Sequence, residues 1–320
     1  MSGFIGVAIV GLLAILVGWL ASVAWRIRNV PGKVAAGIIS SLVDLLLIAL
    51  TALGIAGIWR LNAPQGPPVQ NVTVQATPRL VAFGAQRAHY CAGCHSPNNS
   101  EPLSGGSTNF LQGLASVYAP NLTPGGSLKT WSDGQILRAL RDGVDANGHP
   151  LLIMPSDAFH HLSDHDAEAL VAYLRSQPAV QHVVPQRDVN IIGLLLVGAG
   201  LFPTSAQPAV PEPQTAPAAG VTPQYGHYLV QSIGCSSCHG ENLTGKKPGQ
   251  GPAGPNLTYI VPQWSQSQFV SFMHTGVDPT GHKASSEMPW QDISAAFSDP
   301  ELRAIYAYLH ALPVTVGPNG

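Results

Sequence analysis

The motif Cys-x-x-Cys-His occurs twice in this chain, at residues 91–95 and 235–239, and it uses all four cysteines. This spacing is typical of the attachment site for c-type haem. Two thiols bond to the porphyrin, and the adjacent histidine lies under the ring as an iron ligand. We therefore predict two covalently bound haem c groups. The residues predicted to hold them are Cys91, Cys94 and His95 in the first copy, and Cys235, Cys238 and His239 in the second.

Two other kinds of site use Cys-x-x-Cys pairs. Two such pairs can supply the four ligands of a structural zinc ion. A dithiol redox site has one pair, within a βαβ pattern that neither motif shows. Here the pairs lie far apart in the sequence and a histidine follows both. These features favour haem.

A haem iron that does not bind substrate takes a second axial ligand, and methionine is the first candidate. Met154 and Met288 are each followed by proline, and they follow the two motifs at similar spacing. We predict that they close the two irons, although a lone methionine often only fills a gap in a core. A histidine cluster near Met154 leaves a bis-histidine iron as the alternative. Its members are His149, His160, His161 and His165.

The sequence around the two motifs is also repeated. Pro-Asn-Leu-Thr occurs at 120–123 and 255–258, and Trp-Ser at 131–132 and 264–265. Each copy then ends with a helix signal. Ser163 and Ser298 are good N-caps with an acidic residue three positions later. Pro178 and Pro313 are expected to end these helices.

This arrangement resembles the class I cytochrome c family over residues 78–185 and 222–316. The resemblance implies a helix of small and aromatic residues before each motif, where Gly84, Gly226 and Tyr228 fit, crossed by the terminal helix. The pattern is similar to a narrower group, the multihaem cytochrome c subunits of membrane-bound alcohol and gluconate dehydrogenases. Those subunits typically carry three haem motifs, whereas this chain has two.

The resemblance also implies roles for residues outside the motifs. Pro120 and Pro255 would offer their carbonyl groups to the ligating histidines, which fixes each imidazole. Trp131 and Trp264 would pack near the haem propionates, with ordinary core packing as the alternative.

Two apolar stretches, 4–25 and 34–59, each exceed the roughly 20 residues needed to cross about 30 Å of hydrocarbon. The first is not expected to be a signal peptide, because no basic residue precedes it and it is too long. The loop between them holds Arg26, Arg28 and Lys33 and no acid, which places it in the cytoplasm. We therefore expect a two-pass protein in contact with the lipid of a bacterial inner membrane. Its N-terminus and haem domains would be on the periplasmic side, where haem is attached to such motifs.

Two further features of the apolar segments need an interpretation. Residues 191–202 would span only about 18 Å as a helix, which is too short to cross a membrane. We expect an interdomain helix that packs on a haem domain or a partner, or rests on the membrane surface. Asp44 lies within the second apolar stretch. It indicates a helix–helix or subunit contact, a position near a quinone, or else a protonated or snorkelling acid.

The predicted fold is all-α, with two transmembrane helices followed by two class I cytochrome c domains. Prolines in the segments between these parts indicate an extended tether and a flexible spacer. The predicted parts are a transmembrane hairpin (1–60), a tether (61–78), a first cytochrome c domain (79–186), an apolar segment with a Pro-rich linker (187–222) and a second domain (223–316).

Composition excludes some functions and leaves others open. A net charge of −2 gives no nucleic-acid footprint, and no nucleophile–base set or phosphate loop is present. With methionine on each iron, we expect an electron-transfer protein rather than an enzyme. Its partners would be other subunits of a respiratory or photosynthetic complex, and a soluble carrier or terminal acceptor.

Three alternative functions remain. One is the dihaem subunit of a haem–copper oxidase or of a quinol-oxidising complex. A dihaem peroxidase would need one iron that opens to peroxide. The third is a supernumerary subunit whose haems are mainly structural.

Overall fold

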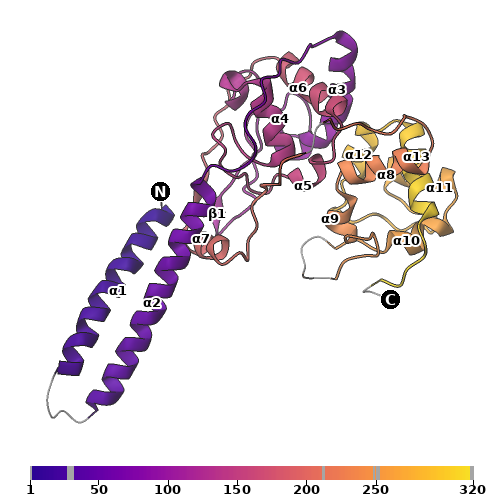
Figure 1. Ribbon diagram of the computed structural model, residues 1–320. Helices are drawn as coiled ribbons and strands as arrows, with labels where there is room; N and C mark the ends of the chain where they lie inside the picture. Colours follow the sequence, from indigo (N-terminus) through magenta and orange to yellow (C-terminus); the bar gives the residue numbers. More distant parts are fainter. Residues whose placement is uncertain (1, 27–31, 211–212, 248, 250–252, 318–320) are drawn as a thin grey trace.

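The computed structural model describes residues 2–26, 32–210, 213–247, 249 and 253–317. A hairpin of two long helices leads into a first and then a second small helical domain (Figure 1). The all-α prediction is confirmed, with one pair of two-residue strands, β1 (Ala115–Ser116) and β2 (Asp188–Val189), in the described chain. Arg28 of the predicted cytoplasmic loop lies outside the described residues.

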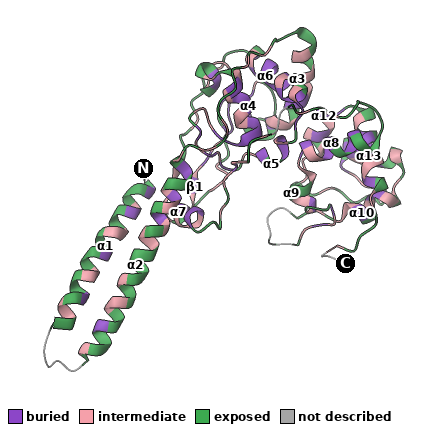
Figure 2. Cartoon of the chain, viewed as in Figure 1, coloured by how far each residue is buried: buried purple, intermediate pink, exposed green. Residues whose placement is uncertain are grey.

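The hairpin consists of α1 (Ser2–Arg26) and α2 (Lys33–Asn62), packed side by side (Figure 1). Both are long and apolar enough to cross a membrane, judged by length and composition. Most of their surface is exposed (Figure 2). Asp44 faces Gly18 of α1, where an added Cβ would lie 2.9 Å from its Oδ2. Asp44 therefore makes a helix–helix contact between α2 and α1, which is one of the roles considered for it.

Each small domain is built around a crossing of its first and last helices. The elements of the first domain are α3 (Pro78–His95), η1 (Ser127–Thr130), α4 (Asp133–Asp142), α5 (Ser156–Phe159) and α6 (Asp164–Ser176). Those of the second domain are α8 (Pro223–Ser232), α9 (Cys235–His239), α10 (Leu257–Ile260), η2 (Val261–Gln263), α11 (Gln266–Thr275), α12 (Trp290–Ala296) and α13 (Asp299–Ala311).

Glycine makes both crossings possible. A Cβ on Gly84 of α3 would lie 1.9 Å from the carbonyl oxygen of Ala169 in α6. A Cβ on Gly226 of α8 would lie 1.9 Å from that of Ala304 in α13. No side chain fits at that distance, so the two helices of each domain touch backbone to backbone, as the resemblance implied.

The caps of the terminal helices are as predicted. Ser163 accepts a hydrogen bond from the Asp166 amide at 3.2 Å, and Ser298 forms a capping box with Glu301. Helices α6 and α13 both end two residues before a proline.

The short apolar run forms α7 (Ile191–Gly198), and it lies between the hairpin and the first domain. A Cβ on Gly57 of α2 would lie 2.0 Å from the Leu194 carbonyl oxygen, so α7 sits directly on α2. Leu194 also shares an apolar cluster with Leu61 of α2 and Leu152 of the first domain. We expected α7 on a haem domain, a partner or the membrane surface. It packs on the first domain, one of these alternatives, and it also packs on the hairpin and so joins the two.

Both proline-rich segments lie along the first domain. In the tether, the Val74 amide donates to Asp133 Oδ2 at 2.9 Å. In the linker after α7, the Ser205 amide donates to the Leu151 carbonyl at 2.8 Å. The backbone in this part of the predicted flexible spacer thus pairs with the backbone of the domain.

Candidate haem sites

Each Cys-x-x-Cys-His motif forms a helical turn at the end of the crossing helix. Residues 91–95 are the last turn of α3, and the second motif is α9. Positions three apart share one face of a helix, so both sulfurs of each motif face the same side. Burial raises the pKa of Cys91 and of Cys235 to about 12. Neither thiol is therefore poised as a thiolate, which argues against a dithiol redox site.

The histidine of each motif is buried and bound to a proline carbonyl. His95 Nδ1 lies 2.9 Å from the Pro120 oxygen, and His239 Nδ1 lies 2.8 Å from the Pro255 oxygen. A carbonyl only accepts, so Nδ1 carries the hydrogen and Nε2 keeps its lone pair. Burial lowers the pKa of both histidines, against the opposing effect of these bonds. Each ring is thus neutral and held in one orientation, and its Nε2 lone pair suits it as an iron ligand.

The asparagine after each of these prolines ties the site to the end of its domain. Asn121 Nδ2 donates to the Val180 carbonyl at 2.9 Å, just after α6. Asn256 Nδ2 donates to the Thr315 carbonyl at 2.7 Å, just after α13. We assigned no role to these residues from the sequence. Their signal was the repeated Pro-Asn-Leu-Thr itself.

The two Met-Pro pairs have the same backbone. The amide two residues after each methionine donates to the methionine carbonyl at 2.8 Å. The prolines between have φ −78°, ψ 55° and φ −81°, ψ 50°, which is the inverse γ-turn. Met154 and Met288 each pack against the core of their own domain. The two methionines thus lie at equivalent positions in equivalent turns. Their role as iron ligands stays a prediction.

A repeated turn precedes each Met-Pro pair, and its recurrence in both domains was not predicted from the sequence. Gly-Val-Asp and Gly-His recur at 143–149 and 276–282. In each copy the aspartate amide donates to the histidine carbonyl, and the aspartate Oδ1 accepts from the histidine amide at 2.9 Å. These turns, centred on Asp145 and Asp278, set the start of the loop that carries the methionine.

The clustered histidines of the first domain have partners of their own. His160 Nδ1 lies 3.1 Å from the Arg141 carbonyl, and the His161 ring packs edge-on against the His160 ring. His149 and His165 pair with neighbouring aspartates. The His160 contact leaves Nε2 with its lone pair, as at His95, so a bis-histidine iron stays the alternative to Met154.

The two tryptophans pack against the domain cores. Trp131 accepts a hydrogen bond from Arg175 at its carbonyl, and the Trp264 ring lies 5.2 Å from that of Phe272. Core packing is the alternative that we considered, and a position near a haem propionate stays a prediction. Across the described ranges, no three His, Cys, Asp or Glu side chains are grouped to hold a metal ion.

Comparison with family models identifies both domains. Residues 224–313 match the model for cytochrome c, and residues 84–174 match that for subunit III of cbb3-type cytochrome c oxidase. The chain therefore carries two cytochrome c domains, which imply covalently bound haem c and a role in electron transfer.

Curated relatives indicate which kind of cytochrome c protein the chain is similar to. The chain is 27% identical to a nicotinate dehydrogenase subunit of Pseudomonas putida over 85% of its length. It is 24% identical to the fructose dehydrogenase cytochrome subunit of Gluconobacter japonicus over 71% of its length. It is also 24% identical to the cytochrome c subunit of a quinone-dependent alcohol dehydrogenase of Gluconobacter oxydans over 72%. The chain is thus similar to cytochrome subunits of dehydrogenases. It spans 24% of the first relative and about half of the other two.

Proposed function

We propose that this chain is a membrane-anchored dihaem cytochrome c that passes single electrons along the outer face of the membrane. The observation that carries this proposal is the duplicated bond between a motif histidine and a proline carbonyl, each in a domain that has its own Met-Pro turn. When bound, each haem supplies a one-electron couple between ferric and ferrous iron. The protein holds the group, orients the histidine and fills the other axial position.

In this proposal the cysteines attach two haem groups, and four side chains ligate the irons. His95 with Met154, and His239 with Met288, would ligate the two irons. With these ligands supplied by the protein, neither iron would have a place for substrate. This supports electron transfer rather than catalysis by this chain.

The anchor in this proposal is the hairpin. Helices α1 and α2 expose apolar side chains along most of their length, an arrangement that lipid would satisfy and water would not. Arg26 and Lys33 lie where the two helices meet the loop, which supports a cytoplasmic loop. Both haem domains are then periplasmic.

The relatives suggest a donor. Three are named as dehydrogenase subunits, so we propose that a dehydrogenase subunit reduces this chain and that a carrier or oxidase accepts the electron. The match of residues 84–174 to a cbb3-type oxidase subunit favours a second candidate, a subunit of a haem–copper oxidase. Copurification from native membranes separates the two, because copper and further haem accompany only the oxidase.

The central test is a haem count with a ligand assay. The full chain, matured with haem c, should carry two covalent haems and fractionate with membranes. Met154→Ala and Met288→Ala should each abolish methionine ligation at one iron, seen as loss of the charge-transfer band that methionine-ligated ferric haem shows. A peroxidase instead predicts that one wild-type iron lacks methionine and reacts with peroxide. That result would exclude the proposal.

A further inference from the structure

The two motifs approach each other across the domain contact. Tyr90 immediately precedes Cys91, and its hydroxyl donates to the Ile233 carbonyl at 3.1 Å, two residues before Cys235. Tyr90 packs against both domain cores. Burial raises the pKa of Tyr90, and the thiol groups of both motifs act in the same direction. This hydrogen bond thus links a side chain beside one motif to the backbone beside the other.

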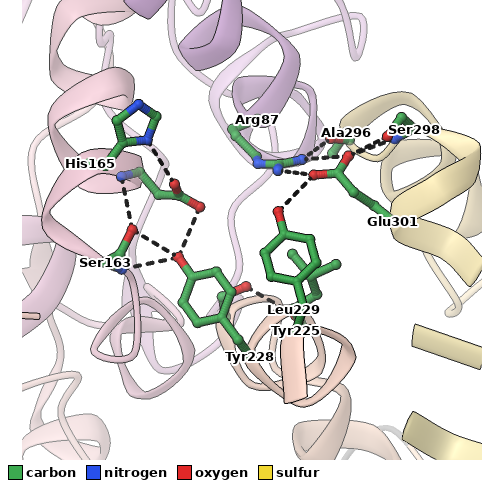
Figure 3. A network of polar contacts seen from close by, with 11 residues as sticks. Arg87, Ser163, His165, Tyr225, Tyr228, Leu229, Ala296, Ser298 and Glu301 are labelled. Carbon is green, nitrogen blue, oxygen red and sulfur yellow. Dashed lines mark hydrogen bonds and ion pairs between the residues drawn. The ribbon is translucent and has the colours of Figure 1, made fainter. Parts of the chain in front are cut away.

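The contact around Tyr90 is fixed by two reciprocal cap contacts (Figure 3). Arg87 of α3 donates to the Ala296 carbonyl at 2.6 Å and pairs with Glu301, at the start of α13. Tyr228 of α8 donates to Asp166 Oδ2 at 2.8 Å, at the start of α6. The crossing helix of each domain therefore completes the N-terminus of the other domain's last helix.

Burial makes the Arg87 contact costly to open. The Arg87 and Glu301 side chains are only 7% and 12% exposed. The guanidinium lies between the Phe83 ring of the first domain and the Phe297 ring of the second, 4.5 and 4.7 Å from their centres. Separation of the domains would leave a charge unpaired and remove a cation–π contact on each side. The two domains accordingly hold one relative position.

Gly234 lets the second motif come close to the first domain. It occupies the position before Cys235 that Tyr90 occupies before Cys91, and it has a φ of 70°. A Cβ there would lie 2.9 Å from the Cβ of Ala158 in α5. A larger side chain would push the domains apart, so glycine at this position allows the close approach of the second motif to α5.

We propose that Tyr90 is the bridge for direct electron transfer between the two haem sites. This inference rests on the proposed function. One electron leaves the reduced haem of one motif and reduces the oxidised haem of the other. No proton moves, and Tyr90 remains a neutral phenol throughout. Its ring and hydrogen bond fill what would otherwise be a through-space gap, across which electron tunnelling is slower than along bonded atoms.

The test uses the full chain with both haems attached. Tyr90→Phe keeps the ring and removes the hydrogen bond to Ile233. Tyr259→Phe is the matched control, because Tyr259 is 57% exposed. One haem is reduced by a light pulse and redistribution of the electron is followed. We expect a several-fold slower redistribution in Tyr90→Phe and the wild-type rate in the control.

A second readout separates bridging from positioning. Magnetic coupling between the two ferric haems, measured by electron paramagnetic resonance, should be unchanged in Tyr90→Phe and weakened in Arg87→Met. A Tyr90→Phe chain with the wild-type rate would overturn the bridge. So would a slower rate accompanied by weakened coupling, because Tyr90 would then only hold the domains. A wild-type chain whose two haems exchange no electron would also overturn the bridge, whereas a chain that matures without covalent haem would contradict the proposed function.

Discussion

The Glu301 carboxylate both caps a helix and joins the two domains. Its Oε2 accepts from the Ser298 amide at 2.8 Å and so caps α13, while Oε1 pairs with Arg87 of the other domain and accepts from Tyr225 at 3.2 Å. The capping role was predictable, because an acid three residues after a serine marks a helix start. The pairing with Arg87 was not, because nothing in the repeat places an arginine opposite this carboxylate.

This dual role predicts a pH dependence of the domain contact. Burial alone raises the pKa of Glu301, but the hydrogen bond and charge of Arg87 and the bonds from Ser298 outweigh it, so the pKa is lowered from 4.5. A lowered pKa in the folded state stabilises the ionised form. The contribution is therefore full above pH 4.5 and is lost as the pH falls through the folded-state pKa.

Glu301→Gln should make the free energy of unfolding less dependent on pH over this acid range, as measured by denaturant unfolding at a series of pH values. Glu287→Gln, at an exposed glutamate, is the control and should leave the slope unchanged. An unaltered slope in Glu301→Gln would show that this carboxylate does not govern the contact.

At the scale of elements, the repeat determines what could be read from the sequence. Haem motifs, proline carbonyls, caps and Met-Pro pairs recur in both copies, so each supported the interpretation of the other. Contacts made by features that occur once were not predicted, and neither were the repeated turns at Asp145 and Asp278. Helix α7 was identified as too short to span a membrane. Its packing on α2 was not predicted, because it depends on a close backbone contact at Gly57 that produces no periodic pattern in the sequence. Tyr90 and Arg87 likewise have no counterpart in the second copy.

The crossing of α3 and α6 gives a prediction in which two effects have opposite signs. Helix propensity alone would make Gly84→Ala stabilising by about 1 kcal/mol. The added Cβ would instead meet the Ala169 carbonyl oxygen at 1.9 Å, and overpacking of this kind costs about 1–3 kcal/mol or more.

We therefore expect Gly84→Ala to lower the melting temperature of the first domain, and Gly226→Ala to do the same in the second. Ala82→Gly, at an exposed site of α3, should be mildly destabilising through propensity alone. A Gly84→Ala chain more stable than wild type would mean that the helices do not cross here.

At the scale of the whole molecule, the hairpin holds the methionine loop of the first domain. Arg187 donates to the Pro150 carbonyl at 2.6 Å and to the Leu61 carbonyl of α2 at 3.2 Å. Leu152, two residues before Met154, packs in the cluster that contains Val7 of α1. The second domain has no such support from the hairpin among the contacts described here.

Arg187→Met should therefore perturb one haem and spare the other. Loss of both hydrogen bonds leaves carbonyl groups unpaired, at about 1–3 kcal/mol each where they are buried. We expect weaker methionine ligation at the first iron, seen in the charge-transfer band and in a redox titration, with the second iron as the internal control. Equal changes at both irons, or none at either, would contradict this link.

The packing of α7 on α2 also limits how far the two haem domains can move relative to the membrane. If the hairpin spans the bilayer as proposed, the first domain stands at a set height above the lipid and the second is clamped beside it. Neither can swing toward a distant partner. The distance of each haem site from the membrane surface is then fixed by the fold. A donor or acceptor must bring its own redox centre to that height, by lateral diffusion or as a fixed neighbour.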